Sequence, residues 1–138
     1  MSDLVLDASV ALQWFLDDEV NRKYSLAILS SLSDKRALVP ILWFYEVGNG
    51  LLMAHRRNRI SVDQMDQFLT RLKALPIDAA QETPAEMLQL PMLAQRHGLT
   101  NYDAAYLGLA MRSGLPLATA DDHLVRAATS AGLRVFTL

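Results

Sequence analysis

Short apolar runs alternate along the chain with longer segments in which apolar residues recur at helical spacing. Strand-favouring runs cover 4–6, 37–39, 115–118 and 134–136, and the pattern allows another over 75–79. Helical spacing and end signals predict helices directly after Asp7 and over about 20–32, 42–58, 61–74, 84–97, 100–112 and 121 or 122 to 131. This alternation is typical of a parallel sheet with helices on both faces, so we predict an α/β fold.

The first apolar run, 4–6, leads directly into Asp7, and a helix follows at once. In parallel α/β sheets, ligands bind in the crevice outside the carboxyl ends of the strands. Asp7 is therefore well placed for chemistry, and Ser9 supplies a hydroxyl two residues later. The alternative is that Asp7 or Ser9 simply caps the first helix.

Composition limits the class of protein more than its chemistry. A chain of 138 residues is large enough for one domain with a real core. The absence of cysteine excludes disulfides and thiolate metal sites. We see no signal peptide and no apolar run long enough to span a bilayer, so we expect a cytoplasmic protein. The net charge of −2 argues against broad electrostatic capture of nucleic acid, although a local basic patch is compatible with it.

Glu46 lies in an apolar run at the start of a predicted helix. It shares a helix face with Asn49 and Gly50, whereas the apolar stripe is made by Trp43, Val47, Leu51 and Ala54. Gly48 and Gly50 each cost about 1 kcal/mol relative to alanine inside a helix, which indicates that something approaches closely. An ordinary amphipathic helix would leave both glycines unexplained.

Two further acids lie where helices begin. Asp103 follows Thr100 at the spacing of a capping box, or it is a carboxylate aimed into the same crevice as Asp7. Asp121 repeats the opening pattern, because it follows an apolar strand and the hydroxyl residue Thr119. Asp122 is either the cap or a further ligand, and we take Asp121 as the inward residue.

Carboxylates that converge in space either raise their pKa values or bind a cation. Oxygen ligands without cysteine or a histidine cluster favour Mg²⁺ or Mn²⁺ over zinc. Such an ion binds substrate phosphate, lowers the pKa of a bound water and stabilises an in-line phosphoryl displacement.

The segments around these acids resemble the four acidic motifs of PIN-domain nucleases. The motifs are Val5-Leu6-Asp7-Ala8-Ser9, Glu46-Val47 with Asn49 and Leu51, Tyr102-Asp103-Ala104-Ala105-Tyr106-Leu107, and Leu117-Ala118-Thr119-Ala120-Asp121. They cover the chain in the right order, and its size is similar to that of VapC toxins from VapBC toxin–antitoxin pairs. The resemblance implies a single PIN domain over 1–138, with a three-layer α/β/α fold around a mostly parallel five-stranded sheet.

The resemblance also implies an endoribonuclease that depends on Mg²⁺ or Mn²⁺ and hydrolyses RNA through a metal-activated water. The metal ligands and catalytic acids would be Asp7, Glu46, Asp103 and Asp121, with Ser9, Asn49 and Thr119 orienting ligands or water behind them. It implies a homodimer, an inhibitory VapB-like antitoxin and a larger toxin–antitoxin assembly.

A basic run, Arg56, Arg57 and Arg59, ends the Glu46 helix. It either contacts the RNA backbone or complements the helix C-terminus. Two other functions compete with the nuclease. An aspartate-based phosphotransfer domain would need a second aspartate at Ser9 or a late lysine, which 133–138 lacks. A non-catalytic PIN-like module that binds RNA or protein is the other.

Overall fold

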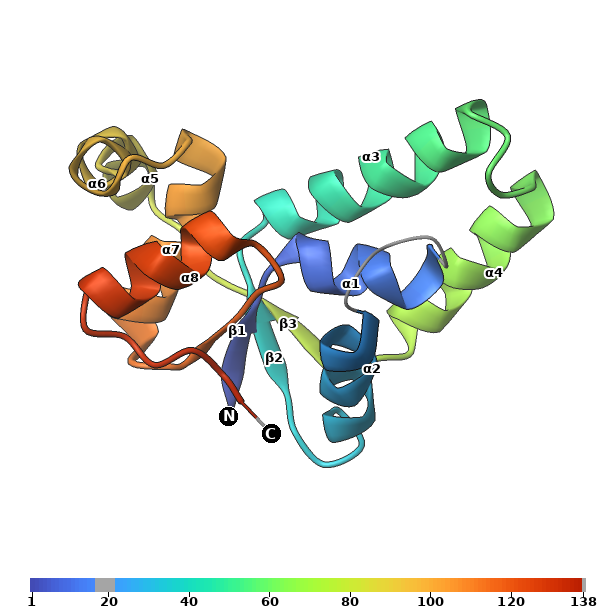
Figure 1. Cartoon of the computed structure of the whole chain (residues 1–138), viewed down its shortest axis with the longest axis horizontal. Helices are drawn as coiled ribbons and strands as arrows, with labels where there is room; N and C mark the ends of the chain where they lie inside the picture. The colour runs from blue at the N-terminus through green and yellow to red at the C-terminus, as the bar shows by residue number, and fades with distance from the viewer. Residues whose placement is uncertain (17–21, 138) are drawn as a thin grey trace.

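The strands form a four-stranded parallel sheet in the order β3-β2-β1-β4 in a computed structural model, which describes residues 1–16 and 22–137 (Figure 1). The strands are β1 Leu4–Leu6, β2 Ala37–Val39, β3 Ile77–Ala79 and β4 Leu117–Ala118. Leu4 pairs with Ala37 on one side of β1, and Val5 pairs with Leu117 on the other. All three residues of β1 are completely buried, as expected for a central parallel strand.

Helices cover both faces of this sheet. Their bounds are α1 Ala8–Phe15, α2 Arg22–Ser31, α3 Leu42–Arg56, α4 Val62–Lys73, α5 Pro84–Leu88, α6 Leu90–His97, α7 Asn101–Ser113 and α8 Asp122–Ser130. Figure 1 shows α1 to α4 on one side of the strands and α5 to α8 on the other. The predicted three-layer α/β/α arrangement with a parallel sheet is therefore confirmed.

The predicted fifth strand is not confirmed. Its segment, 134–136, forms a single parallel bridge between Val135 and Leu117 in the described chain. The amide of Leu117 donates to Arg134 O at 3.0 Å, and the amide of Phe136 donates to Leu117 O at 2.8 Å. Both hydrogen bonds involve Leu117, so the segment pairs with β4 at one residue and forms no continuous ladder.

The helix predicted over 84–97 is divided into α5 and α6 at Gln89. Pro91, in the first turn of α6, has no amide hydrogen, and inside a longer helix its ring would clash with the carbonyl of Met87. The helix predicted to reach residue 58 ends at Arg56, since Asn58 has a positive φ of 60°. The start predicted for the second helix, at residue 20, lies outside the described residues, as do the preceding acids Asp17, Asp18 and Glu19.

Gly50 of α3 faces α1 at very short range. A Cβ built on Gly50 would lie 2.5 Å from Leu12 Cδ2 and 2.8 Å from Leu12 Cδ1, whereas a Cβ on Gly48 would meet no described atom within 4 Å. The close approach predicted from these glycines is therefore made at Gly50, and a neighbouring helix makes it.

We expect Gly48→Ala to stabilise the protein by about 0.5–1 kcal/mol, because alanine favours the helix and the space is open. Gly50→Ala gains the same propensity but displaces the Leu12 side chain, so we expect a net destabilisation of about 1 kcal/mol. Urea unfolding of both variants measures the difference. In a Leu12→Ala background, Gly50→Ala should become stabilising; a persistent penalty would show that Leu12 is not its cause.

No helix in the part of the chain that the structure describes is long and apolar enough to cross a membrane.

Candidate functional site

Asp7 lies at the carboxyl end of β1 and is only 6% exposed. Its Oδ2 accepts hydrogen bonds from Ser9 Oγ and Thr119 Oγ1, both at 2.7 Å. Asp7 occupies the N-cap position of α1, but its side chain makes no capping hydrogen bond. The capping alternative therefore does not explain this aspartate. The two hydroxyls instead hold the Asp7 carboxylate in place through Oδ2.

Burial raises the pKa of Asp7 from 3.8 to about 6. The hydrogen bonds from Ser9 and Thr119 act in the opposite direction, while the charges of Glu46 and Asp103 raise the pKa further. Three acids that are far apart in the sequence therefore lie close enough in space to repel one another.

Glu46 projects from the first turns of α3 and is partly buried. Its Oε1 accepts a hydrogen bond of 2.5 Å from the hydroxyl of Tyr106 on α7. Burial raises the pKa of Glu46, the Tyr106 hydrogen bond lowers it, and the charge of Asp103 raises it again. Tyr106 is a site residue that our sequence analysis did not single out. Its position one helical turn after Asp103 was the available signal.

Asp103 lies in the first turn of α7, where its amide donates to Thr100 Oγ1 at 3.1 Å. In this contact Thr100 caps the helix through the Asp103 amide, so the Asp103 carboxylate is not used for capping and can face the other acids. Burial and the charge of Asp121 raise the pKa of Asp103.

Asp121 is the N-cap of α8, and its Oδ1 accepts from the amide of His123 at 2.9 Å. Its own amide donates to Thr119 Oγ1 at 3.0 Å, which connects it to the hydroxyl that binds Asp7. Asp121 therefore caps a helix and also interacts electrostatically with Asp103. Asp122, the adjacent acid, is exposed.

The four acids thus form a chain of repelling charges, which we call the acidic cluster: Asp7, Glu46, Asp103 and Asp121. Within residues 1–16 and 22–137, no three acidic or histidine side chains stand close enough together to hold one ion directly. Magnesium often binds through one or two carboxylates and keeps several waters, and the donor set of the cluster fits that mode.

Other predicted residues lie outside the cluster. Asn49 is exposed on α3, three residues beyond Glu46. Arg56, Arg57 and Arg59 are exposed at the opposite end of α3, where Arg56 lies roughly 15 Å from Glu46 along the helix axis at about 1.5 Å per residue.

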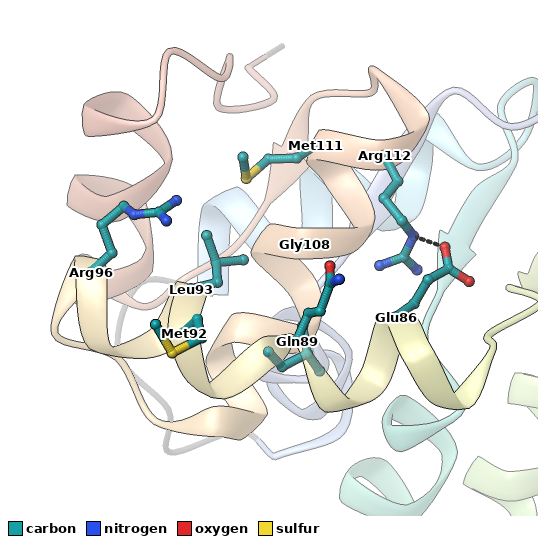
Figure 2. A pocket seen from close by; sticks show the side chains of 9 residues that line it. Glu86, Gln89, Met92, Leu93, Arg96, Gly108, Met111 and Arg112 are labelled. Atoms are coloured by element: carbon teal, nitrogen blue, oxygen red, sulfur yellow. Dashed lines mark ion pairs between the residues drawn. The ribbon is translucent and has the colours of Figure 1, made fainter.

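A hollow of about 520 Å³ lies between α5–α6 and α7 (Figure 2). Met92, Leu93 and Met111 line it, and an ion pair of 2.8 Å between Arg112 Nε and Glu86 Oε2 borders it. The described residues that line this hollow include none of the four acids, so it is separate from the candidate site.

Comparison with known proteins connects this geometry to a family. A family model described as PIN domain matches residues 4–129. The chain belongs to the PIN-domain family. Ribonuclease VapC3 from Pyrobaculum aerophilum is 33% identical to this PIN domain over 125 residues, which cover 88% of this chain and 91% of the relative. The predicted membership among VapC-like PIN-domain ribonucleases is therefore confirmed.

Solved structures agree on the fold of this PIN domain. The crystal structure of VapC20 from Mycobacterium tuberculosis, a sarcin-ricin loop cleaving toxin, superposes with a TM-score of 0.69 at 12% identity, covering 99% of this chain and 100% of that one. VapBC2 from Rickettsia felis, solved bound to a DNA fragment from its promoter, gives a TM-score of 0.65 at 11% identity and 96% coverage of both chains.

Proposed function

We propose that this PIN domain is the toxin of a VapBC-type pair and acts as a metal-dependent endoribonuclease at the acidic cluster. The observation that carries the proposal is the position of Asp7, which is buried at the end of the central strand with its pKa raised to about 6 beside Glu46 and Asp103. The ribonuclease named VapC3, at 33% identity, supports the nuclease class.

A divalent cation fits the cluster for an electrostatic reason. An RNA phosphate would be repelled by four carboxylates that already repel one another, and the nearest arginine run lies at the other end of α3. PIN-domain ribonucleases depend on a metal ion in general. We propose Mg²⁺ or Mn²⁺, held mainly by Asp7 and Asp103, with Glu46 and Asp121 completing the site. When bound, such an ion lowers the pKa of a water ligand and neutralises charge on the phosphate.

The hydroxyls of Ser9 and Thr119 orient the Asp7 carboxylate. Ser9 and Thr119 donate to the same oxygen of Asp7, so Oδ1 is left to face the site. Ser9 Oγ also accepts from the amide of Ala120 at 3.2 Å, which ties the end of β4 to the start of α1. The roles that we predicted for Ser9 and Thr119 are supported by these contacts.

The partners follow from the same proposal. VapBC2 from Rickettsia felis was solved bound to a DNA fragment from its promoter, and by analogy we propose a VapB-like antitoxin for this chain. We also propose a homodimer within a larger toxin–antitoxin assembly. Arg56, Arg57 and Arg59 stay as predicted contacts to RNA phosphates outside the cluster.

The test is cleavage of end-labelled RNA by the purified protein. We expect cleavage in Mg²⁺ or Mn²⁺, its loss in excess EDTA, and recovery when the ion is restored. Because we propose water as the nucleophile, a 2′-deoxy substitution at the cleaved position should leave the bond cleavable. Products ending in a 2′,3′-cyclic phosphate would contradict this mechanism. RNA binding in Mn²⁺ without any cleavage would favour the non-catalytic module.

A further inference from the structure

The hydroxyl of Tyr106 lies where three of the acid-bearing segments meet. Tyr106 is 1% exposed and projects from α7, the helix that begins with Asp103. Its hydroxyl donates to Glu46 Oε1 on α3 at 2.5 Å. The backbone of Ala8, the residue that follows Asp7 at the start of α1, lies beside the same hydroxyl. The Tyr106 oxygen therefore lies between α3 and the start of α1.

The contact with Glu46 restricts a flexible side chain. Glu46 is partly buried beside Asp103, and without a donor its flexible side chain could turn away from the other carboxylates. The hydroxyl of Tyr106 fixes one oxygen of Glu46 and leaves the other for the site.

The chemistry of the two groups fixes the direction of this hydrogen bond. A phenol carries a proton at neutral pH and a carboxylate carries none, so the Tyr106 hydroxyl donates the hydrogen bond and Glu46 Oε1 accepts it.

We propose that Tyr106 is a positioning residue of the acidic cluster, which holds the Glu46 carboxylate against the start of α1 and thereby sets the affinity of the site for its divalent cation. This inference rests on the proposed function. Groups that orient metal ligands typically change metal affinity or activity by about 10–100-fold when they are removed.

The test is Tyr106→Phe, which removes one oxygen atom and keeps the ring that fills the core. We expect Mn²⁺ to bind the full-length protein about 10-fold more weakly without RNA, as measured by calorimetry or by the free Mn²⁺ signal in electron paramagnetic resonance. The Mn²⁺ concentration for half-maximal RNA cleavage should rise by the same factor, while KM for RNA at saturating Mn²⁺ stays unchanged.

Ile28→Val is the matched control for stability, because Ile28 is completely buried in α2 and has no role in the cluster. It should lower Tm without weakening Mn²⁺ binding. In a Glu46→Ala background, Tyr106→Phe should cause no further loss of Mn²⁺ affinity, since the carboxylate that it positions has been removed. A further loss in that background would overturn the proposal.

A second variant addresses the position of the carboxylate without altering Tyr106. Glu46→Asp keeps the charge but shortens the side chain beyond the reach of the Tyr106 hydroxyl, so we expect Mn²⁺ affinity to fall by a factor similar to that of Tyr106→Phe. Wild-type affinity in either variant would overturn the inference alone. Absence of Mn²⁺ binding in the wild-type protein would overturn the proposed metal-dependent function, and this inference with it.

Discussion

Asp7→Asn and Asp103→Asn are each expected to reduce the rate of RNA cleavage by roughly 10³-fold or more while leaving the protein folded. Both substitutions keep the shape of the side chain and remove the negative charge that the proposed cation needs. Asp7 is fixed by two hydroxyls, and the amide oxygen of asparagine can accept the same hydrogen bonds. Single-turnover cleavage of labelled RNA in Mn²⁺, with circular dichroism of each variant, provides the measurement.

The adjacent acids 121 and 122 provide a matched control. Asp121 raises the pKa of Asp103 and is bound to Thr119 through its amide, whereas Asp122 is exposed at the start of α8. Asp121→Asn should therefore slow cleavage strongly, and Asp122→Asn should leave it close to wild type. Cleavage by Asp7→Asn that persists in EDTA would refute the metal mechanism. Equal losses at positions 121 and 122 would refute our choice of the inward acid.

The placement of Asp7 could be predicted because its signal is local. A buried strand that ends in an acid, followed directly by a helix, puts that acid at the ligand-binding edge of a parallel sheet. The same logic located Asp121 after β4. Capping was an open alternative for Asp7, and Asp122 was the cap candidate beside Asp121. In the structure Asp121, not Asp122, caps α8, and Asp7 makes no capping hydrogen bond.

Glu46 and its partner show where sequence reasoning ends. The cost of Gly48 and Gly50 indicated a close approach to α3, but no sequence pattern identifies Leu12 as the group that comes close. Tyr106 was missed for a related reason. A tyrosine within an apolar helix is usually a core residue, and its hydroxyl partner is 60 positions away in the sequence. Long-range hydrogen bonds of this kind depend on how α3 and α7 pack against the sheet.

The errors in the elements also have physical causes. The prediction of one helix over 84–97 gave too little weight to Pro91, which is acceptable in the first turn of a helix but not in its interior. The predicted fifth strand depended on strand propensity over 134–136. Propensity alone does not make a strand when the segment pairs with its neighbour β4 at Leu117 only.

Without a divalent metal at pH 7.5, Asp7→Asn should make the protein more stable than wild type by about 1–2 kcal/mol. A pKa of about 6 in the folded protein, against 3.8 for the ordinary carboxyl, corresponds to about 3 kcal/mol of cost for keeping Asp7 charged. Asparagine removes that cost but buries an amide group that needs its own partner, so the gain is smaller than the full amount. Thermal or urea unfolding in EDTA measures it.

The stability difference between Asp7→Asn and wild type should depend on pH. Between about pH 3.8 and pH 6 the folded protein holds the Asp7 proton more tightly than the unfolded chain, so wild-type stability falls as the pH rises through that window. The advantage of Asp7→Asn should therefore be full above pH 6 and vanish below about pH 4. An Asp7→Asn variant that is less stable than wild type at pH 7.5 would contradict the argument.

Adding Mg²⁺ should make wild type more stable than Asp7→Asn, which reverses their order of stability in EDTA. A ligand that binds only the folded state stabilises it in proportion to the logarithm of its concentration above Kd, and wild type retains the charge that binds the cation. Tm of wild type should rise with Mg²⁺, while Tm of Asp7→Asn should change little. The buried charge of Asp7 thus costs stability in the metal-free protein, and we expect the same charge to be indispensable for cleaving RNA.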